Sequence, residues 1–164
     1  MKMSFYSVSR MAAILLAAAL ALSAHAAELA AGDSVPAFSA KDQFGNDFKF
    51  NPGLHFLLLG FDMRGSKAAT QQFTSLGAGW LEQHSAAYVL DIHTMPSVIT
   101  RLFALPKMRK CPARIILCED GKTLAPYPRQ TEKITVLSVT PDGKIKEIRY
   151  WDPVSENIAQ WLKN

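Results

Sequence analysis

The sequence predicts an α/β fold in which a central mixed sheet is flanked by helices. An apolar run from Leu54 to Phe61, interrupted only by His55, has the length of a strand that is covered on both faces. Directly after it, apolar residues recur at intervals of three and four, which is the spacing of a helix. A second apolar run and a second helical segment follow, so strands and helices alternate along the chain.

The first 26 residues have the parts of a secretory signal peptide. Lys2 and Arg10 precede an apolar run over residues 11–22, and residues 23–26 (SAHA) form a small-residue cleavage site. The run has about 12 residues, whereas a membrane-spanning helix needs ~20. We therefore predict that residues 1–26 are cleaved, that the protein is secreted to the periplasm, and that no membrane span remains after cleavage.

The remaining residues, 27–164, are predicted to form one domain, because they are enough for a single core and contain no linker or repeat. Removal of Lys2 and Arg10 from the 18 basic residues leaves 16 against 14 acidic ones. So small a net charge does not argue for nucleic-acid binding, and none is predicted.

The first half of this domain begins with an extended segment over residues 32–38. A hairpin over residues 42–48 follows, turning at Gly45-Asn46. After the apolar strand 54–61, a helix begins near Ser66, whose side chain is predicted to cap it by accepting a backbone N–H. The apolar residues of that helix are Ala69, Phe73, Leu76 and Trp80.

The second half continues with a strand over 87–92 and a short helix over 98–105 that Pro106 is predicted to end. Two hairpins are predicted next from their Asp-Gly turns, one at residues 114–122 and one at 134–151. A final helix is predicted over residues 153–162.

Three segments together resemble the thioredoxin-like superfamily, and in particular its peroxiredoxin and TlpA-type branch. They are GDSVPAFSAKDQFGNDFKF, LHFLLLGF leading into a helix, and ITVLSVTPDGKIKEIRYW followed by the last segment. The resemblance extends over nearly the whole domain. It implies a thioredoxin-like three-layer sandwich whose chemistry lies at the turn between the apolar strand and the helix.

In that family this turn carries sulfur, because the N-terminus of a helix stabilises a thiolate. TlpA-type proteins have Cys-x-x-Cys there and peroxiredoxins have a peroxidatic cysteine, whereas this sequence has FDMRGSK at residues 61–67. Disulfide exchange and peroxide reduction both need an attacking sulfur. The resemblance therefore predicts a thioredoxin-like protein without the usual activities at this turn.

Two interpretations of this turn remain open. Arg64 and Lys67, with the free N–H groups of the helix start, would hold an anion such as phosphate or a partner's carboxylate, and Asp62 and Ser66 complete this candidate binding site. Alternatively, Asp62 and Ser66 satisfy the turn itself while the two cations are solvated.

The family also places a cis-proline before the strand that aligns with residues 134–137. This sequence has Glu132-Lys133 at that position. In a rival alignment Pro112 takes the role, but that alignment leaves the hairpin at 134–151 unexplained, so we prefer the first.

The two cysteines are candidates for sulfur chemistry elsewhere. An extended chain would place Cys111 and Cys118 on the order of 20 Å apart, too far for a disulfide, which needs about 7 Å. Lys107, Arg109 and Lys110 would lower the pKa of Cys111 and make it reactive. The alternatives are that the three cations form a solvated or partner-binding loop, and that Cys111 is a loop thiol and Cys118 a small core side chain.

No metal or cofactor is predicted. His55, His84 and His93 lack the spacing of metal ligands, and no G-x-G-x-x-G follows a strand. We predict a non-catalytic binding or accessory module of the periplasm, with a protein or small anionic ligand as partner. One alternative is a thiol-disulfide oxidoreductase that uses Cys111 or Cys118, and the other is a flavin-linked oxidoreductase.

Overall fold

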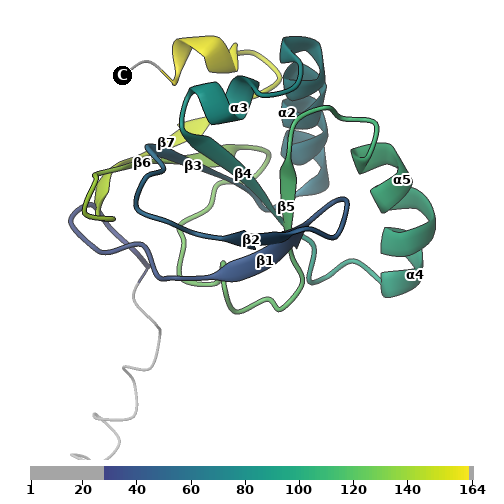
Figure 1. The fold of residues 1–164 in the computed structure, drawn as a ribbon, viewed down its shortest axis with the longest axis horizontal. Coiled ribbons are helices and arrows are strands. Elements are labelled where there is room, and N and C mark those ends of the chain that lie inside the picture. Colours follow the sequence, from purple (N-terminus) through teal and green to yellow (C-terminus); the bar gives the residue numbers. More distant parts are fainter. Residues whose placement is uncertain (1–27, 163–164) are drawn as a thin grey trace, which may run out of the picture.

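The computed structural model describes residues 28–162, so the predicted signal peptide lies outside the described part. One seven-stranded sheet runs through it in the order β2-β1-β5-β4-β3-β6-β7 (Figure 1). The strands are β1 (Ser39–Asp42), β2 (Asp47–Lys49), β3 (Phe56–Gly60), β4 (Ala86–Asp91), β5 (Ile115–Cys118), β6 (Ile134–Val139) and β7 (Ile145–Trp151). The predicted mixed sheet of an α/β fold is confirmed.

The strands at the centre of the sheet are parallel and those toward its edges are antiparallel. β3, β4 and β5 pair in parallel, while β6 pairs antiparallel with β3. Two hairpins complete the sheet, β1–β2 on the side of β5 and β6–β7 on the side of β3. Both agree with the hairpins predicted from the Gly45-Asn46 and Asp142-Gly143 turns.

The helices follow β3 and β4. α2 (Met63–Leu76) comes directly after β3, and α3 (Trp80–Gln83) leads into β4. After β4, α4 (Ser97–Ile99), the π-helical turn η1 (Thr100–Ala104) and α5 (Leu105–Met108) follow one another without a break. A single 3₁₀ turn, η2 (Ile158–Gln160), lies near the end of the described chain.

The sheet separates two cores, because successive side chains of a strand point to opposite faces. In β3, Phe56 and Leu58 belong to the first core while Leu57 and Leu59 belong to the second. Helical side chains pack on the first core, and side chains of irregular segments such as Phe38 pack on the second. The helices therefore gather on one face of the sheet, and the third layer consists largely of irregular chain.

Aromatic rings join α2 to the sheet within the first core. The ring of Phe73 lies 4.8 Å from that of Tyr88 and 6.0 Å from that of Trp151, measured between centroids. All three side chains are at most 1 % exposed. Trp151 also donates from Nε1 to the carbonyl of Glu156 at 3.1 Å, so it fixes the last segment of the chain to the sheet.

A buried glutamine fixes the β1–β2 turn to the start of β5. The Gln43 side chain, 1 % exposed, donates to the carbonyl of Ala113 at 2.9 Å and accepts from the N–H of Ile115 at 2.8 Å. The Gln43 carbonyl in turn accepts from Nε of Arg109 at 2.9 Å, just after α5. The β1–β2 turn and the end of α5 are therefore neighbours.

The hairpin predicted at Asp120-Gly121 is wrong. β5 already has a partner on each side, β1 and β4, so the chain that follows it has no free edge of β5 to pair with. That chain instead crosses the second core, into which it places Leu124 and Tyr127. The Asp120 carboxylate accepts from the N–H groups of Lys122 and Thr123 and stabilises the turn without a second strand.

Two helix boundaries also differ from the prediction. Pro106 does not end its helix, because the turn before it is widened: the N–H of Leu105 donates to the carbonyl of Thr100, five residues earlier, and the chain continues as α5. The final helix predicted over residues 153–162 is reduced to η2. The Asp152 and Asn157 side chains bind nearby N–H groups there and favour turns over a longer helix.

Candidate functional site

The end of β3 and the start of α2 are packed closely together. A Cβ atom on Gly60, the last residue of β3, would lie 2.5 Å from Oγ of Ser66 and 2.7 Å from Cδ2 of Leu90. Only glycine leaves room for this contact. The strand therefore passes directly into a turn formed by Phe61 and Asp62, and α2 begins at Met63.

Asp62 is the N-cap of α2. Its backbone is extended, and Oδ1 of its carboxylate accepts from the N–H of Gly65 at 2.8 Å. The prediction that Ser66 caps the helix is therefore wrong. Ser66 lies one turn inside α2, where its N–H donates to the carbonyl of Asp62 and its own carbonyl accepts from the Tyr88 hydroxyl.

The same carboxylate also binds the segment before β6. Oδ2 of Asp62 accepts from the N–H of Glu132 at 2.8 Å. A Cβ atom on Gly65 would lie 2.8 Å from the carbonyl oxygen of Glu132, so this segment rests directly on the first turn of α2. Glu132 has a φ of 62°, an unusual conformation for a residue with a side chain. A long-range contact therefore holds the segment against the helix start.

The chain's own carboxylate thus occupies the start of α2, where a positive dipole and unpaired N–H groups favour an anion. Of the two cations predicted to hold an anion there, Arg64 forms an ion pair with Glu132 at 2.9 Å. Lys67 is exposed and has no ion pair within residues 28–162. Asp62, Arg64 and Glu132 therefore form one group, and Ser66 contributes through its backbone.

Glu132-Lys133 stands where the preferred alignment places the cis-proline of thioredoxins. The pair directly precedes β6, the antiparallel neighbour of β3. Pro112 instead precedes β5, which is separated from β3 by β4. Every peptide bond in residues 28–162 is trans.

The two cysteines are buried on opposite faces of the sheet. Cys111 is 2 % exposed and belongs to the first core, where its thiol donates to the carbonyl of Thr70 at 3.8 Å. Cys118 is 4 % exposed and belongs to the second core. Both are free thiols. A bridge between them would have to cross the sheet.

Burial raises the pKa of the Cys118 thiol to about 12, and the nearby carboxylates of Asp120 and Asp91 raise it further. Such a thiol contains very little thiolate at neutral pH, and the thiolate is the nucleophile. Cys111 is separated in exposure from the three cations predicted to activate it. Its thiol is buried in the core, whereas Lys107, Arg109 and Lys110 are exposed.

The two groups of predicted binding residues do not meet. No hydrogen bond or ion pair between described residues joins the first turn of α2 to the cations of residues 107–110. Arg109 binds the β1–β2 turn through Gln43. His93 also has a local partner, since its Nδ1 lies 2.5 Å from Oδ1 of Asp91. Within residues 28–162, no three His, Cys, Asp or Glu side chains gather as a metal site requires.

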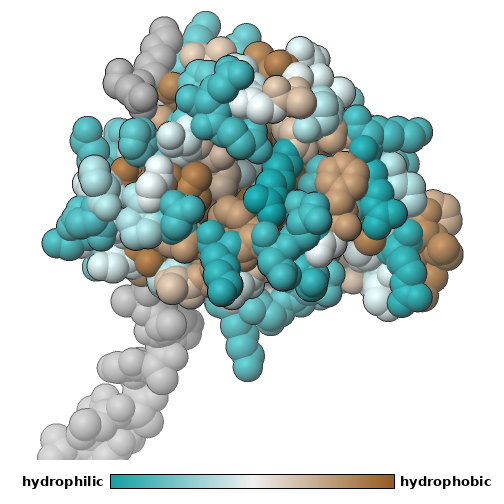
Figure 2. All heavy atoms as spheres, in the orientation of Figure 1, coloured by the Kyte–Doolittle hydropathy of each residue, from teal (hydrophilic) through white to brown (hydrophobic). Residues whose placement is uncertain are grey.

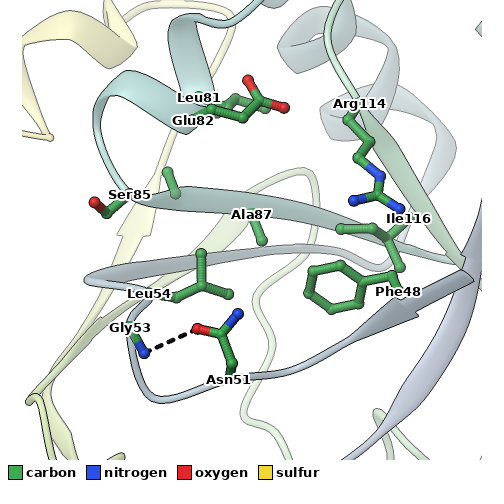
Figure 3. A pocket seen from close by; sticks show the side chains of 11 residues that line it. Phe48, Asn51, Gly53, Leu54, Leu81, Glu82, Ser85, Ala87, Arg114 and Ile116 are labelled. Atoms are coloured by element: carbon green, nitrogen blue, oxygen red, sulfur yellow. Dashed lines mark hydrogen bonds between the residues drawn. The ribbon is translucent and has the colours of Figure 1, made fainter.

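A hollow of about 310 Å³ lies beside the starts of β4 and β5 (Figure 3). Its lining includes the side chains of Glu82 and Arg114. The Arg114 guanidinium is already bound, by Nε to the Asp42 carboxylate at 3.0 Å and by its other end to the carbonyl of Asp47 at 2.9 Å. The Arg114 side chain therefore serves the β1–β2 hairpin.

Two features of the candidate site were not anticipated from the sequence. The sequence gives Glu132 only the position of a proline in similar folds, and its contact with Asp62 spans 70 positions. The exposed apolar face of α4 and η1 was also missed. The signal for it is present in the sequence, because Val98, Ile99, Leu102 and Phe103 have the spacing of one helix face.

Comparisons with known proteins give the fold. No protein-family model matches the sequence, and no curated protein matches it. Among solved structures, the chain is similar to the thioredoxin domain of a thiol-disulfide oxidoreductase from Bacteroides vulgatus, with a TM-score of 0.53 and 16 % identity over 83 % of this chain and 100 % of that one.

Two further structures show the same likeness. StoA from Bacillus subtilis gives a TM-score of 0.54 and 18 % identity over 78 % of this chain and 95 % of its own. Peroxidoxin BcpB from Mycobacterium tuberculosis gives a TM-score of 0.51 and 18 % identity over 75 % of this chain and 86 % of its own. Identities this low indicate shared architecture alone. The fold is that of thioredoxin-like proteins of the peroxiredoxin and thiol-disulfide oxidoreductase type, as the sequence predicts.

Proposed function

We propose that this protein is a thioredoxin-like module that does not carry out thiol chemistry and that acts by binding. One observation carries the proposal: the Asp62 carboxylate fills the start of α2 and is held by two backbone N–H groups, from Gly65 and Glu132. Disulfide exchange and peroxide reduction both need an attacking sulfur, and a carboxylate cannot replace it in either reaction.

The alternative of a thiol-disulfide oxidoreductase would need Cys111 or Cys118 to reach a substrate. Each thiol is at most 4 % exposed, and the two are in different cores. Reactive thiols are found in accessible, electropositive surroundings with a lowered pKa. The burial of both thiols therefore supports the binding role over the redox role.

A flavin-linked oxidoreductase is also less well supported. Dinucleotides place their pyrophosphate on the free N–H groups of a helix start. At the start of α2 the N–H of Gly65 is already bonded to Asp62, and the negative charge of that carboxylate would repel a phosphate. The residues present at this position therefore do not suit such a cofactor.

The location proposed for this role is the periplasm, on the basis of the signal peptide predicted for residues 1–26. None of the helices in the described part of the chain has the length and apolar character to cross a bilayer. The proposed partner is a protein or an anionic surface or ligand. The cations available to receive it are Lys67 on α2 and Lys107, Arg109 and Lys110 at the end of α5.

A turnover assay tests the absence of thiol chemistry. We expect the protein to reduce a protein disulfide in the presence of dithiothreitol, and to consume hydrogen peroxide, no faster than its Cys111→Ala/Cys118→Ala variant. A catalytically active thioredoxin serves as the positive control. A rate above background that disappears in either single cysteine variant would make the protein an oxidoreductase and overturn the proposal.

A further inference from the structure

The helical segment between β4 and β5 has an exposed apolar face. Val98, Leu102 and Phe103 are 62 %, 62 % and 58 % exposed, and Ile99 is 44 % exposed. These four residues lie at positions i, i+1, i+4 and i+5, so they form one stripe along α4 and η1. Figure 2 shows hydrophobic atoms at the right edge of the molecule, where Figure 1 draws α4 and α5.

The opposite face of this segment is already used for packing. Thr100 is buried, and Met95, Leu105 and Met108 pack against the first core. The four exposed side chains are therefore not needed to attach the segment to the sheet. A helix that is apolar on both faces is normally covered on both. Large apolar side chains gathered on a surface indicate an interaction site.

Cations accompany the stripe along the sequence, and no acidic residue interrupts it. Residues 92–118 contain five Lys or Arg and no Asp or Glu. Arg101 lies between the apolar residues, and Lys107 and Lys110 follow in and just after α5; all three are exposed. We call this surface the basic apolar ridge and define it as Val98, Ile99, Arg101, Leu102, Phe103, Lys107 and Lys110.

The β1–β2 turn lies beside the end of α5, near the ridge. Arg109 binds the carbonyl of Gln43 at 2.9 Å, which places this turn beside the end of α5. The next residue, Phe44, is 55 % exposed at the tip of the turn. A second exposed aromatic side chain therefore accompanies the ridge from a different part of the chain.

We propose that the basic apolar ridge docks the protein on an anionic lipid membrane surface. Helices that bind membrane surfaces combine Phe and Leu on one side with Lys and Arg beside them, and they bury the apolar side chains at the level of the headgroups. The exposed cations match the negative charge of the lipid, and their long side chains reach the headgroups while the apolar stripe enters the interface.

The charge of the ridge decides between this occupant and a second copy of the chain. A symmetric dimer would place Arg101, Lys107 and Lys110 of one copy against the same cations of the other, which is unfavourable. The segment also lies at the outer side of the fold, beyond β5 (Figure 1). A fluid interface conforms to such a segment without a complementary pocket.

This inference deepens the proposed binding role by naming its partner. The two fail separately, because a thiol activity in the turnover assay would leave vesicle binding unaffected. The test is flotation of the purified protein with vesicles of phosphatidylcholine alone and of phosphatidylcholine with phosphatidylglycerol. We expect flotation only with the anionic vesicles, and less of it in high salt because salt screens the charges.

Matched variants show whether the ridge is responsible. Leu102→Ser/Phe103→Ser is expected to weaken binding about tenfold or more, since apolar burial drives insertion. Lys107→Gln/Lys110→Gln is expected to weaken it about fivefold per charge. The controls are Val154→Ser, at 62 % exposure outside the ridge, and Lys144→Gln/Lys146→Gln, which removes two exposed charges at the start of β7 on the opposite side of the sheet. Neither control is expected to change binding.

Three results would overturn the proposal. The first is no flotation with anionic vesicles, and the second is binding that the ridge variants and the controls affect equally. The third is ridge-dependent binding to something other than lipid. Dimers that disappear in Leu102→Ser/Phe103→Ser would indicate a second copy, and ridge-dependent binding of polyglutamate without vesicle binding would indicate an acidic protein.

Discussion

Replacing Trp151 with alanine is expected to lower the free energy of unfolding by about 3–5 kcal/mol, the usual loss when a fully buried large aromatic side chain is truncated. Trp151 is 0 % exposed and lies against Phe73, so its removal leaves a cavity between α2 and the sheet. The hydrogen bond from its Nε1 to the Glu156 carbonyl is lost as well. Domains of this size are stable by only about 5–15 kcal/mol, so this loss is a large fraction.

The measurement is guanidinium unfolding followed by far-ultraviolet circular dichroism, with the slope m compared between variants. Trp161→Ala is the control, because Trp161 is only half-buried. The Arg149 guanidinium carbon lies over its ring, 4.9 Å from the ring centroid. This variant is expected to lose less than half as much stability. Equal losses in the two variants would contradict the role given to Trp151 in the first core.

The second large effect is expected at the start of α2. Asp62→Ala removes an N-cap, which costs about 0.5–2 kcal/mol, and leaves the N–H of Glu132 without its partner, which costs about 1–3 kcal/mol. Asp62→Asn keeps only one acceptor oxygen for two N–H donors. Its stability is therefore expected to lie between those of the wild type and the alanine variant.

Amide hydrogen exchange separates this effect from a general loss of stability. The N–H of Glu132 is expected to exchange faster in Asp62→Ala, because its acceptor is gone. Arg64→Ala is the matched control: it breaks an exposed ion pair with Glu132 and is expected to cost under about 1 kcal/mol. If Arg64→Ala and Asp62→Ala were equally stable, Asp62 would not be holding the segment before β6 in place.

The sequence predicts the sheet well where the pattern is local. The apolar run of β3 and the turns at Gly45-Asn46 and Asp142-Gly143 depend on neighbouring residues, and all three are in the structure. The Asp120-Gly121 turn has the same local signal but no second strand follows it. The difference arises because β5 lies between β1 and β4, and strand order is not visible in a turn.

The candidate site was only partly predictable for the same reason. That the turn after β3 lacks cysteine can be read directly from residues 61–67. That Asp62 caps the helix and binds Glu132 depends on a contact across 70 positions. Ser66 and Asp62 are both residue types that favour an N-cap, and in the structure Asp62 caps α2 and also accepts from Glu132.

The burial of the thiols could be predicted for only one of the two. Cys118 lies in an apolar strand, which indicates a core position. Cys111 follows several cations in the sequence, and that pattern indicates an exposed loop. The chain turns inward after Lys110, so that Cys111 and Ala113 reach the first core while the cations stay outside.

The proposal that this protein with a thioredoxin-like fold has no working thiol is tested most directly by the mass of the protein isolated from its own host. Thiols should be trapped by alkylation before and after unfolding. We predict a chain that begins at Ala27, carries no adduct, and takes up two alkyl groups only after unfolding. A mass lower by two hydrogens, a mixed disulfide on Cys111, or a bound flavin or metal would contradict the account.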